Sequence, residues 1–548
     1  MNFIFLVIFG VYVSFACAET NLGTLNTIKT GFATLKECES TDKGLGTCPG
    51  NPLQGLEDLL NFTTTNQCIA SKSHFKNHEV SIPKCPGSND QIKGLDNTFP
   101  TAGIFALYTG DNDSFIHNLV SNYLEGNEAG RFNLVLPKSK MSLLRNNPEL
   151  IKVLNSSRVN IIPVDTMPSV DRWMQDSFQF LSVNGKPALY QLEHFRETGT
   201  PIKNRLACEL ARKCNLPYFI PPDMVDPLNK DYNSLNSGGN LEVLPGGTFY
   251  TGIIKTEGFH RNLRGNAKVP FRTKFQNIQK KSLESSGNKV LELDTSFLSV
   301  GHVDEIINIV KTSNSAPCDY AVLMASPEKA FELMEQTADK VDKLKKDTSF
   351  LFHFGDLFVS SAYAQNIIIS DSATNRCSEH SYSSLNRDGS NTVISKEQTE
   401  TIYKNSCIDG EPIERYVNSN EYKILKRENL DSDSPASIKQ IMNENRVALI
   451  DELRKTTKCN SPQIIPIPVF FRNGLSYTPD LVNGVVHTPP GEPSNVILPR
   501  SYFNPFDKYV KEELKKYGVS TTLVHDMGYH LKQGEVHCGT NSARICNL

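Results

Sequence analysis

The sequence predicts an α/β fold, because short apolar runs alternate with amphipathic helical stretches from about residue 101 onward. These runs have the length and composition of buried strands. They are Ile104–Tyr108, Phe132–Leu136, Val159–Val164, Tyr320–Met324, Ile464–Phe471 and Val496–Leu498. The clearest helix follows Ser326, a favourable N-cap residue, with Pro327 at its first position. Its apolar face has spacings of three and four residues and consists of Phe331, Met334, Ala338, Val341 and Leu344.

The composition is that of a globular protein with a sizeable core. Of 548 residues, 39% are hydrophobic and 21% are charged, and no strict internal repeat is visible. The 57 Lys and Arg residues against 60 Asp and Glu residues give a net charge of −3, without a basic run. A nucleic-acid-binding protein needs a concentrated positive field, so the composition argues against nucleic acid as a partner.

The N-terminus has the pattern of a secretory signal peptide. Residues 1–18 are uncharged, with an apolar stretch from Phe3 to Val13 and a small-residue ending at Ala18. We expect cleavage before Glu19 and a secreted, extracellular protein. Because no later stretch reaches about 18 consecutive apolar residues, no membrane contact is expected after cleavage. A buried N-terminal helix or an uncleaved anchor is the alternative interpretation.

Sequons and cysteines agree with an extracytoplasmic route. Asn-x-Ser/Thr triplets begin at Asn61, Asn112 and Asn155 and predict a glycoprotein. Loss of Cys17 with the signal leaves twelve of the 13 cysteines, most of which would pair in an oxidising compartment. No two cysteines have the CxxC spacing, which argues against a zinc ribbon.

The chain divides into regions of different character. Residues 19–98 contain four cysteines and little periodicity, and we interpret them as a small leader region, stapled by disulfides, whose function cannot be read. Residues 99–548 form the main α/β domain. Within it, residues from about 370 to about 435 are rich in Ser, Asn, Asp and Glu and predict a polar, mobile insertion.

Two short segments hold side chains suited to catalysis. One reads Asp-Arg-Trp-Met-Gln-Asp and contains the only Trp of the chain, Trp173, which in isolation would be a core residue. The other ends a strand-like run in Gly301 and places His302 and Asp304 two positions apart. In extended backbone this spacing puts an imidazole and a carboxylate on one face. Taken alone, the second segment is more simply explained by a His satisfied by local hydrogen bonds and an Asp in a turn.

A third segment, Gly534–Asn541, lies close to the C-terminus. Cys538 precedes a Gly here, and in a secreted chain it could equally be half of a disulfide. If Cys538 stays a thiol, eleven cysteines remain, so at least one other is unpaired. His537 would point to the opposite face of a strand, which makes it a poor general base for the thiol and favours a structural role.

Taken together, these segments resemble the catalytic signatures of protein-arginine deiminases. The matching strings are Trp-Met-Gln-Asp, Gly-His-Val-Asp and the specific Gly-Glu-Val-His-Cys-Gly-Thr-Asn, in this order. The run from Asn483 through Pro499 is also similar to that family. The resemblance covers roughly residues 100–548, with a divergent middle, and makes residues 99–548 the catalytic domain. It implies the five-bladed α/β propeller of guanidine-modifying, or pentein, enzymes.

The resemblance assigns four catalytic residues, whose chemistry fits a guanidinium substrate. Asp176 and Asp304 would grip this planar cation by its edges. The Cys538 thiolate would attack the central carbon and form a covalent thiouronium intermediate. His302 would protonate the departing ammonia and then activate water. The product would be citrulline, and no organic cofactor is implied.

Other roles also follow from the resemblance alone. Trp173 would form a wall of the slot for the substrate stem, and Arg205 would contact the substrate backbone. Calcium is a candidate cofactor, and the positions that match its ligands are Gln175, Gln179, Gly238, Leu241 and Glu242. Family Glu residues are replaced by Ser177 and Gln179, so at least one calcium site loses charge and is expected to be lost.

Three functions remain open at this point. The leading hypothesis is a secreted hydrolase that deiminates arginine in peptides or proteins. The first alternative is an enzyme of the same fold that acts on free arginine, agmatine or another small guanidine. The second is an inactive secreted binding protein that keeps the fold, which a disulfide between Cys538 and Cys546 would favour.

Overall fold

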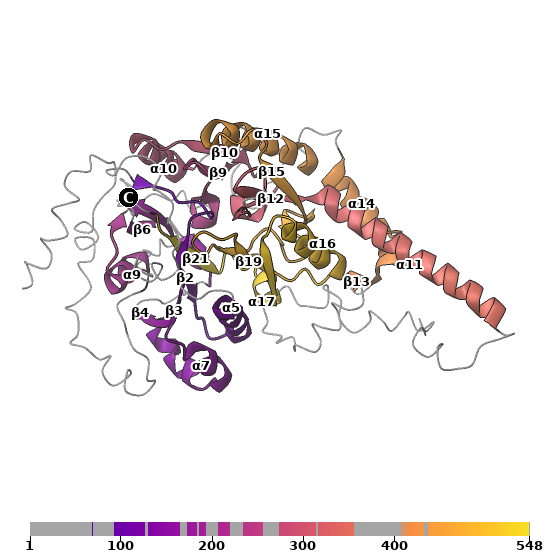
Figure 1. The fold of residues 1–548 in the computed structure, drawn as a ribbon, viewed down its shortest axis with the longest axis horizontal. Coiled ribbons are helices and arrows are strands. Elements are labelled where there is room, and N and C mark those ends of the chain that lie inside the picture. Colours follow the sequence, from indigo (N-terminus) through magenta and orange to yellow (C-terminus); the bar gives the residue numbers. More distant parts are fainter. Residues whose placement is uncertain are drawn as a thin grey trace, which may run out of the picture.

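The computed structural model describes residues 68, 92–125, 130–164, 172–183, 186–192, 206–219, 234–255, 273–313, 316–355, 407–408, 411–431 and 437–546. The predicted signal peptide, almost all of the leader region and the sequon at Asn61 lie outside these residues and stay predictions. In the described part, helices and strands alternate along the chain, which confirms the α/β fold class (Figure 1).

Five sheets of three or four strands make up the body of the described chain. In the two four-stranded sheets the strand order is β21 (Thr540–Arg544), β2 (Thr101–Leu107), β3 (Arg131–Pro137), β4 (Val159–Val164), and β1 (Ile92–Lys93), β5 (Phe178–Val183), β6 (Lys186–Gln191), β7 (Tyr218–Phe219). In two of the three-stranded sheets it is β10 (Val290–Asp294), β9 (Phe249–Ile253), β8 (Leu241–Val243), and β11 (Ile307–Lys311), β12 (Tyr320–Ser326), β15 (Gln463–Pro468). In the third it is β18 (Val485–His487), β19 (Asn495–Pro499), β20 (Ser520–Val524). Two hairpins accompany them, β13 (Cys407–Ile408) with β14 (Glu411–Pro412) and β16 (Phe471–Arg472) with β17 (Leu475–Ser476).

Every one of the five sheets contains the same three-strand unit. A central strand pairs antiparallel with one neighbour and parallel with a strand that follows it in the chain. Each parallel crossover contains a helix, as parallel pairing requires. In chain order these helices are α5 (Asp113–Glu125), α9 (Leu206–Cys214), α10 (Lys274–Ser285), α11 (Pro327–Gly355) with α15 (Ile438–Thr457), and α16 (Asn504–Lys515). The fold therefore repeats a unit that the sequence does not reveal, while closure into a five-bladed propeller stays a prediction.

The predicted strands agree closely with the observed ones. Val159–Val164 is identical to β4, whereas the run Ile464–Phe471 divides into β15 and the start of β16. The shorter helices also have their own bounds: α6 (Met141–Arg145), α7 (Pro148–Leu154), α8 (Met174–Ser177), α13 (Ile413–Tyr416), α14 (Asn420–Leu430) and α17 (Met527–His530). No helix in the described ranges is both long enough and apolar enough to span a bilayer.

Helix α11 begins where the sequence predicts it. The Ser326 hydroxyl accepts a hydrogen bond of 3.2 Å from the Lys329 backbone N–H, as an N-cap does. Phe331, Met334 and Ala338 are buried on the predicted apolar face. The far half of the helix projects away from the body of the molecule (Figure 1).

The expectation of a polar, mobile insertion is wrong for its C-terminal part. Residues 411–430 contain α13 and α14, which pack on α11 rather than extend into solvent. Tyr422 is buried, its ring centroid lies 5.4 Å from that of Phe331, and its hydroxyl donates a hydrogen bond to Glu335. The sequence analysis missed these helices because the segment is mostly polar and only a few of its apolar residues pack against α11. Residues 370–406 lie outside the described part.

Two disulfides whose cysteines both lie in the described residues join distant parts of the chain. Cys68 of the leader region bonds Cys214 in α9, and Cys318 bonds Cys459, with Cα–Cα distances of 5.3 and 6.0 Å. The leader region is therefore tied to the main domain. Cys538 is the free cysteine among the described residues.

Candidate active site

The four candidate catalytic residues come from three segments and meet in the interior. Asp176 lies in the one-turn helix α8, and Cys538 lies in a turn just before β21. His302 precedes a short 3-10 helix that runs from Val303 to Glu305 and carries Asp304. All four side chains are buried.

Their polar atoms lie within a few ångströms of one another. His302 Nδ1 is 3.8 Å from Asp176 Oδ1 and 4.0 Å from Asp304 Oδ1. The Cys538 Sγ is 3.7 Å from Asp304 Oδ2. An imidazole therefore lies between two carboxylates, and a thiol lies beside one of them.

The backbone around His302 differs from the extended geometry that the sequence analysis assumed. Gly301 has a φ of +85°, a left-handed conformation that favours glycine, and it turns the chain just before His302. The Thr295 hydroxyl donates a hydrogen bond of 2.9 Å to the Gly301 carbonyl. Asp304 then follows in a 3-10 turn, so this turn, rather than strand alternation, brings the carboxylate beside the imidazole.

The expected position of His537 is also wrong. Residues 535–540 form a helical turn, with hydrogen bonds from Gly539 N to Glu535 O and from Thr540 N to His537 O. Consecutive side chains in such a turn are about 100° apart rather than on opposite faces. His537 Nδ1 therefore lies 2.8 Å from Asp304 Oδ2.

His537 also faces a second carboxylate. Its Nε2 lies 3.6 Å from Glu242 Oε1. Burial alone would lower the pKa of His537, but the carboxylates of Glu242 and Asp304 raise it above its ordinary value. Burial raises the pKa of Glu242 to about 7.

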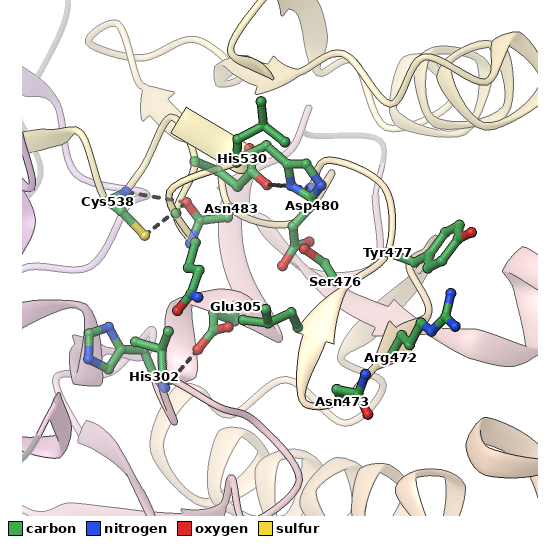
Figure 2. Close-up of a pocket in the computed structure, with 16 residues that line it drawn as sticks. His302, Glu305, Arg472, Asn473, Ser476, Tyr477, Asp480, Asn483, His530 and Cys538 are labelled. Carbon is green, nitrogen blue, oxygen red and sulfur yellow. Dashed lines mark hydrogen bonds and ion pairs between the residues drawn. The ribbon is translucent and has the colours of Figure 1, made fainter. Parts of the chain in front are cut away.

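Asn483 holds the thiol segment in place, and the sequence analysis did not assign it a role. Its Oδ1 accepts a hydrogen bond of 3.2 Å from the Cys538 backbone N–H and lies 3.4 Å from the Cys538 Sγ. Its Nδ2 donates 3.2 Å to the Asp304 carbonyl. Figure 2 shows the Asn483 side chain beside the sulfur, at the inner end of the pocket. The sequence feature that pointed to Asn483 was its place in the run Asn483–Pro499, which is similar to the deiminase family.

The pocket that contains Cys538 and His302 has an acidic wall. The partly buried Glu305 and the buried Asp480 and Glu535 line it, while the β16–β17 hairpin forms its outer end (Figure 2). Burial raises the pKa of all three carboxyl groups well above their ordinary values. A cation that entered would favour their charged forms, so the wall suits a positively charged ligand.

Asp176, Asp304 and Trp173 are not among the residues that line this pocket, although both carboxylates lie beside its His302. Trp173 is buried behind Gly534, and a Cβ added to Gly534 would lie 2.4 Å from the indole ring. The ring thus supports a residue that lines the pocket, and its role as a wall of the slot stays a prediction. Arg205 lies outside the described residues, so its role also stays a prediction.

The candidate calcium positions converge at a second, smaller pocket. Gln175, Gln179 and Glu242 line it. Gly238 packs so closely on the Gln175 carbonyl that an added Cβ would lie 1.9 Å from that oxygen. The Gly238 carbonyl accepts a hydrogen bond from the Leu241 N–H, at the start of β8.

A family comparison identifies the chain's relatives. The family model for protein-arginine deiminase (PAD) matches residues 139–547, which include all four candidate catalytic residues. The chain belongs to the protein-arginine deiminase family. It is similar to mouse protein-arginine deiminase type-3, with 25% identity over 390 residues that cover 68% of this chain and 46% of that protein. The human type-3 enzyme is 24% identical over 332 residues, covering 58% and 39%. The chain spans about half the length of the curated relatives it matches.

Solved structures of deiminases are more distant. Agmatine deiminase of Enterococcus faecalis matches with a TM-score of 0.42 and 11% identity, covering 84% of this chain and 99% of that one. Agmatine deiminase of C. jejuni matches with a TM-score of 0.39 and 12% identity, covering 83% and 97%.

The thiol of this deiminase-family chain is expected to be protonated at neutral pH in the substrate-free protein. Burial raises the pKa of Cys538 well above its ordinary value, and the carboxylates of Asp304 and Asp176 raise it further. Below that pKa the thiolate fraction grows about tenfold per pH unit. Alkylation of substrate-free protein by iodoacetamide should therefore accelerate about tenfold per unit from about pH 6 to about pH 9. Mass mapping of Cys538 measures this rate, and a flat profile would show a preformed thiolate.

Gly239 gives a steric test of the family's catalytic geometry in this chain. An added Cβ would lie 2.7 Å from His302 Nδ1 and 2.8 Å from Asp304 Oδ2. Gly239→Ala is therefore expected to displace both side chains and to lower the activity proposed below about a hundredfold, because small displacements of reacting groups are costly. Gly528→Ala is the matched control, since its Cβ would meet no atom within 4 Å. Equal activity of the two variants would contradict the assigned geometry.

Proposed function

We propose that this PAD-family chain is a hydrolase that deiminates arginine in peptides or proteins, giving citrulline and ammonia. The observation that carries the proposal is the free, buried Cys538 thiol, 3.7 Å from Asp304, beside an imidazole placed between two carboxylates. Family membership supports the same reaction.

Electrostatic attraction between the guanidinium cation and two carboxylates drives substrate binding in this proposal. A guanidinium is planar and presents N–H donors in a fixed fork, so two carboxylates can hold its edges in bidentate fashion. Asp176 and Asp304 supply that pair. With the cation held between them, the central carbon lies next to the sulfur and stays electrophilic.

The reaction then proceeds in two halves. The Cys538 thiol gives its proton to His302 as the sulfur forms a bond to the guanidinium carbon. His302 then passes this proton to one nitrogen, and the C–N bond breaks with its electron pair to release ammonia. Water, which gives a proton to His302, adds to the carbon of the remaining thiouronium. The C–S bond breaks, the sulfur keeps the electron pair, and His302 returns a proton to it. The second proton of the water leaves the new carbonyl oxygen and is taken up by the released ammonia, so neutral citrulline departs with the water oxygen.

The cysteine arrangement favours an enzyme over an inactive binding protein. Cys546 is disulfide-bonded, while Cys538 is free, so the two do not form the disulfide that would block the nucleophile. An open thiol in an acidic pocket is what the deiminase proposal requires.

The test of this function compares three guanidines under identical conditions. Purified chain is incubated with an arginyl peptide, free arginine or agmatine, and citrulline or carbamoyl product and ammonia are quantified by mass spectrometry. We expect the arginyl peptide to have the highest kcat/KM. A higher value for free arginine or agmatine would move the assignment to a small guanidine, and no ammonia from any of the three would overturn it.

We also propose that the protein is secreted as a glycoprotein, on the basis of its N-terminal pattern, sequons and disulfides. Asn155 is exposed at the end of α7, whereas Asn112 is buried and its Nδ2 donates hydrogen bonds to the Leu107 carbonyl and the Tyr529 hydroxyl. Glycan mapping of secreted protein should find Asn155 occupied and Asn112 empty. A glycan on Asn112 would contradict the packing around α5.

A further inference from the structure

The side chains of Gln175, Gln179 and Glu242, which would face a calcium ion, already form hydrogen bonds with one another. Gln175 Nε2 donates hydrogen bonds of 2.9 Å to Gln179 Oε1 and 2.9 Å to Glu242 Oε1. The Gln175 amide thus turns its N–H groups, rather than its oxygen, toward both acceptors. All three residues are buried, so these bonds replace solvent contacts.

The charge of this set does not fit calcium either. Calcium takes about six to eight oxygen ligands, usually with several carboxylates. Glu242 is the single carboxylate among the candidate ligands, and the described ranges hold no group of three or more His, Cys, Asp or Glu residues suited to a metal ion. His537 and the buried Arg544 also line the pocket of the candidate calcium ligands. His537 Nε2 lies near Glu242, and Arg544 attracts Glu242 electrostatically.

His537 connects this network to the catalytic groups. Its Nδ1 holds Asp304 Oδ2 at 2.8 Å, while its Nε2 lies 3.6 Å from Glu242. Gln175 also donates from its backbone N–H to the Cys538 carbonyl at 3.1 Å. The network therefore joins the segments that carry Asp176, Asp304 and Cys538.

We propose that this metal-free network of Gln175, Gln179, Glu242 and His537 assembles the active site in place of calcium, with His537 as the residue that positions Asp304. The kinetic part rests on the proposed deiminase function, whereas the absence of calcium binding does not. A hydrogen bond to one oxygen fixes the orientation of the whole carboxylate toward the guanidinium, without a metal to order its loop.

Calcium binding is the first test, and it requires no turnover. Full-length protein is titrated with calcium chloride in a calorimeter, and its thermal unfolding is compared in millimolar calcium and in EGTA, a range that covers weak extracellular sites. We expect no saturable heat and the same unfolding midpoint, because an ion that binds only the folded state would raise it. Saturable binding or a raised midpoint would each overturn the proposal.

The second test separates positioning from simple support. His537→Ala should raise KM for an arginyl peptide about tenfold or more, since it removes a hydrogen bond to a charged group. His537→Asn, whose amide can reach Asp304 as Nδ1 does, should recover most of this loss, and His537→Gln, which reaches toward Glu242, should not. If the change in KM of all three variants instead parallels the drop in their unfolding midpoints, His537 has only a structural role and the positioning role is refuted. An inactive wild-type chain would refute the proposed function, while the calcium result would still decide the metal-free network.

Discussion

Cys538→Ser is expected to lower kcat/KM for an arginyl peptide by about a thousandfold or more. Serine keeps the shape of the side chain, but its hydroxyl is a far weaker nucleophile toward a resonance-stabilised cation than a thiolate. Removal of a nucleophile from an enzyme with covalent catalysis typically costs at least this factor. Citrulline formation measured by mass spectrometry over long incubation quantifies the residual rate.

The same variant should still bind substrate. Its acidic pocket and both guanidinium-holding carboxylates are unchanged, so Kd for the peptide, measured by calorimetry, should stay within about threefold. The unfolding midpoint serves as the folding control. A serine variant with more than about a tenth of wild-type activity would mean that Cys538 is not the nucleophile.

Asp304→Asn and Asp176→Asn are expected to cause the next largest losses. Each removes the charge that opposes the guanidinium in a buried site, and removal of one partner of such a pair costs roughly 2–5 kcal/mol, a factor of about 30 to several thousand. Asp304→Asn should be the more severe, because this carboxylate also contacts Cys538 at 3.7 Å and His537 at 2.8 Å.

Steady-state kinetics on the arginyl peptide separate the two effects. Asp176→Asn should act mainly through KM, and Asp304→Asn through both KM and kcat. Asp342→Asn is the matched control, because Asp342 is exposed on α11 and is not among the residues that line the Cys538 pocket, so the activity of this variant should be unchanged. Retention of more than half of the activity by either catalytic variant would contradict the proposed grip on the guanidinium.

Local patterns in the sequence account for much of the fold. The alternation of apolar runs and helices predicts the α/β class, and the N-cap at Ser326 predicts the start of α11. The five-fold repetition of one strand unit could not be predicted from local patterns, because its members share pairing geometry rather than residues, and only the family resemblance implied it. Pairings such as β21 with β2 join opposite ends of the domain, and no local periodicity encodes them.

The candidate site also has a part that the sequence predicts and a part that it does not. Short strings identify Asp176, His302, Asp304 and Cys538, and the structure brings these residues together. Their surroundings could not be read, because the acidic wall, Asn483 and the contact between His537 and Asp304 depend on three-dimensional packing and on a helical turn where a strand was assumed. Spacing arguments hold only for the backbone conformation that they presuppose.

The most direct test of the account is to trap the reaction on the sulfur. Protein mixed with saturating arginyl peptide is quenched in acid at successive short times, and its peptides are mapped by mass spectrometry. We expect a transient adduct on Cys538 with the mass of the substrate less one ammonia, which decays as citrulline appears. Citrulline formed with no such adduct at any time, or with an adduct on another residue, would contradict nucleophilic attack by Cys538.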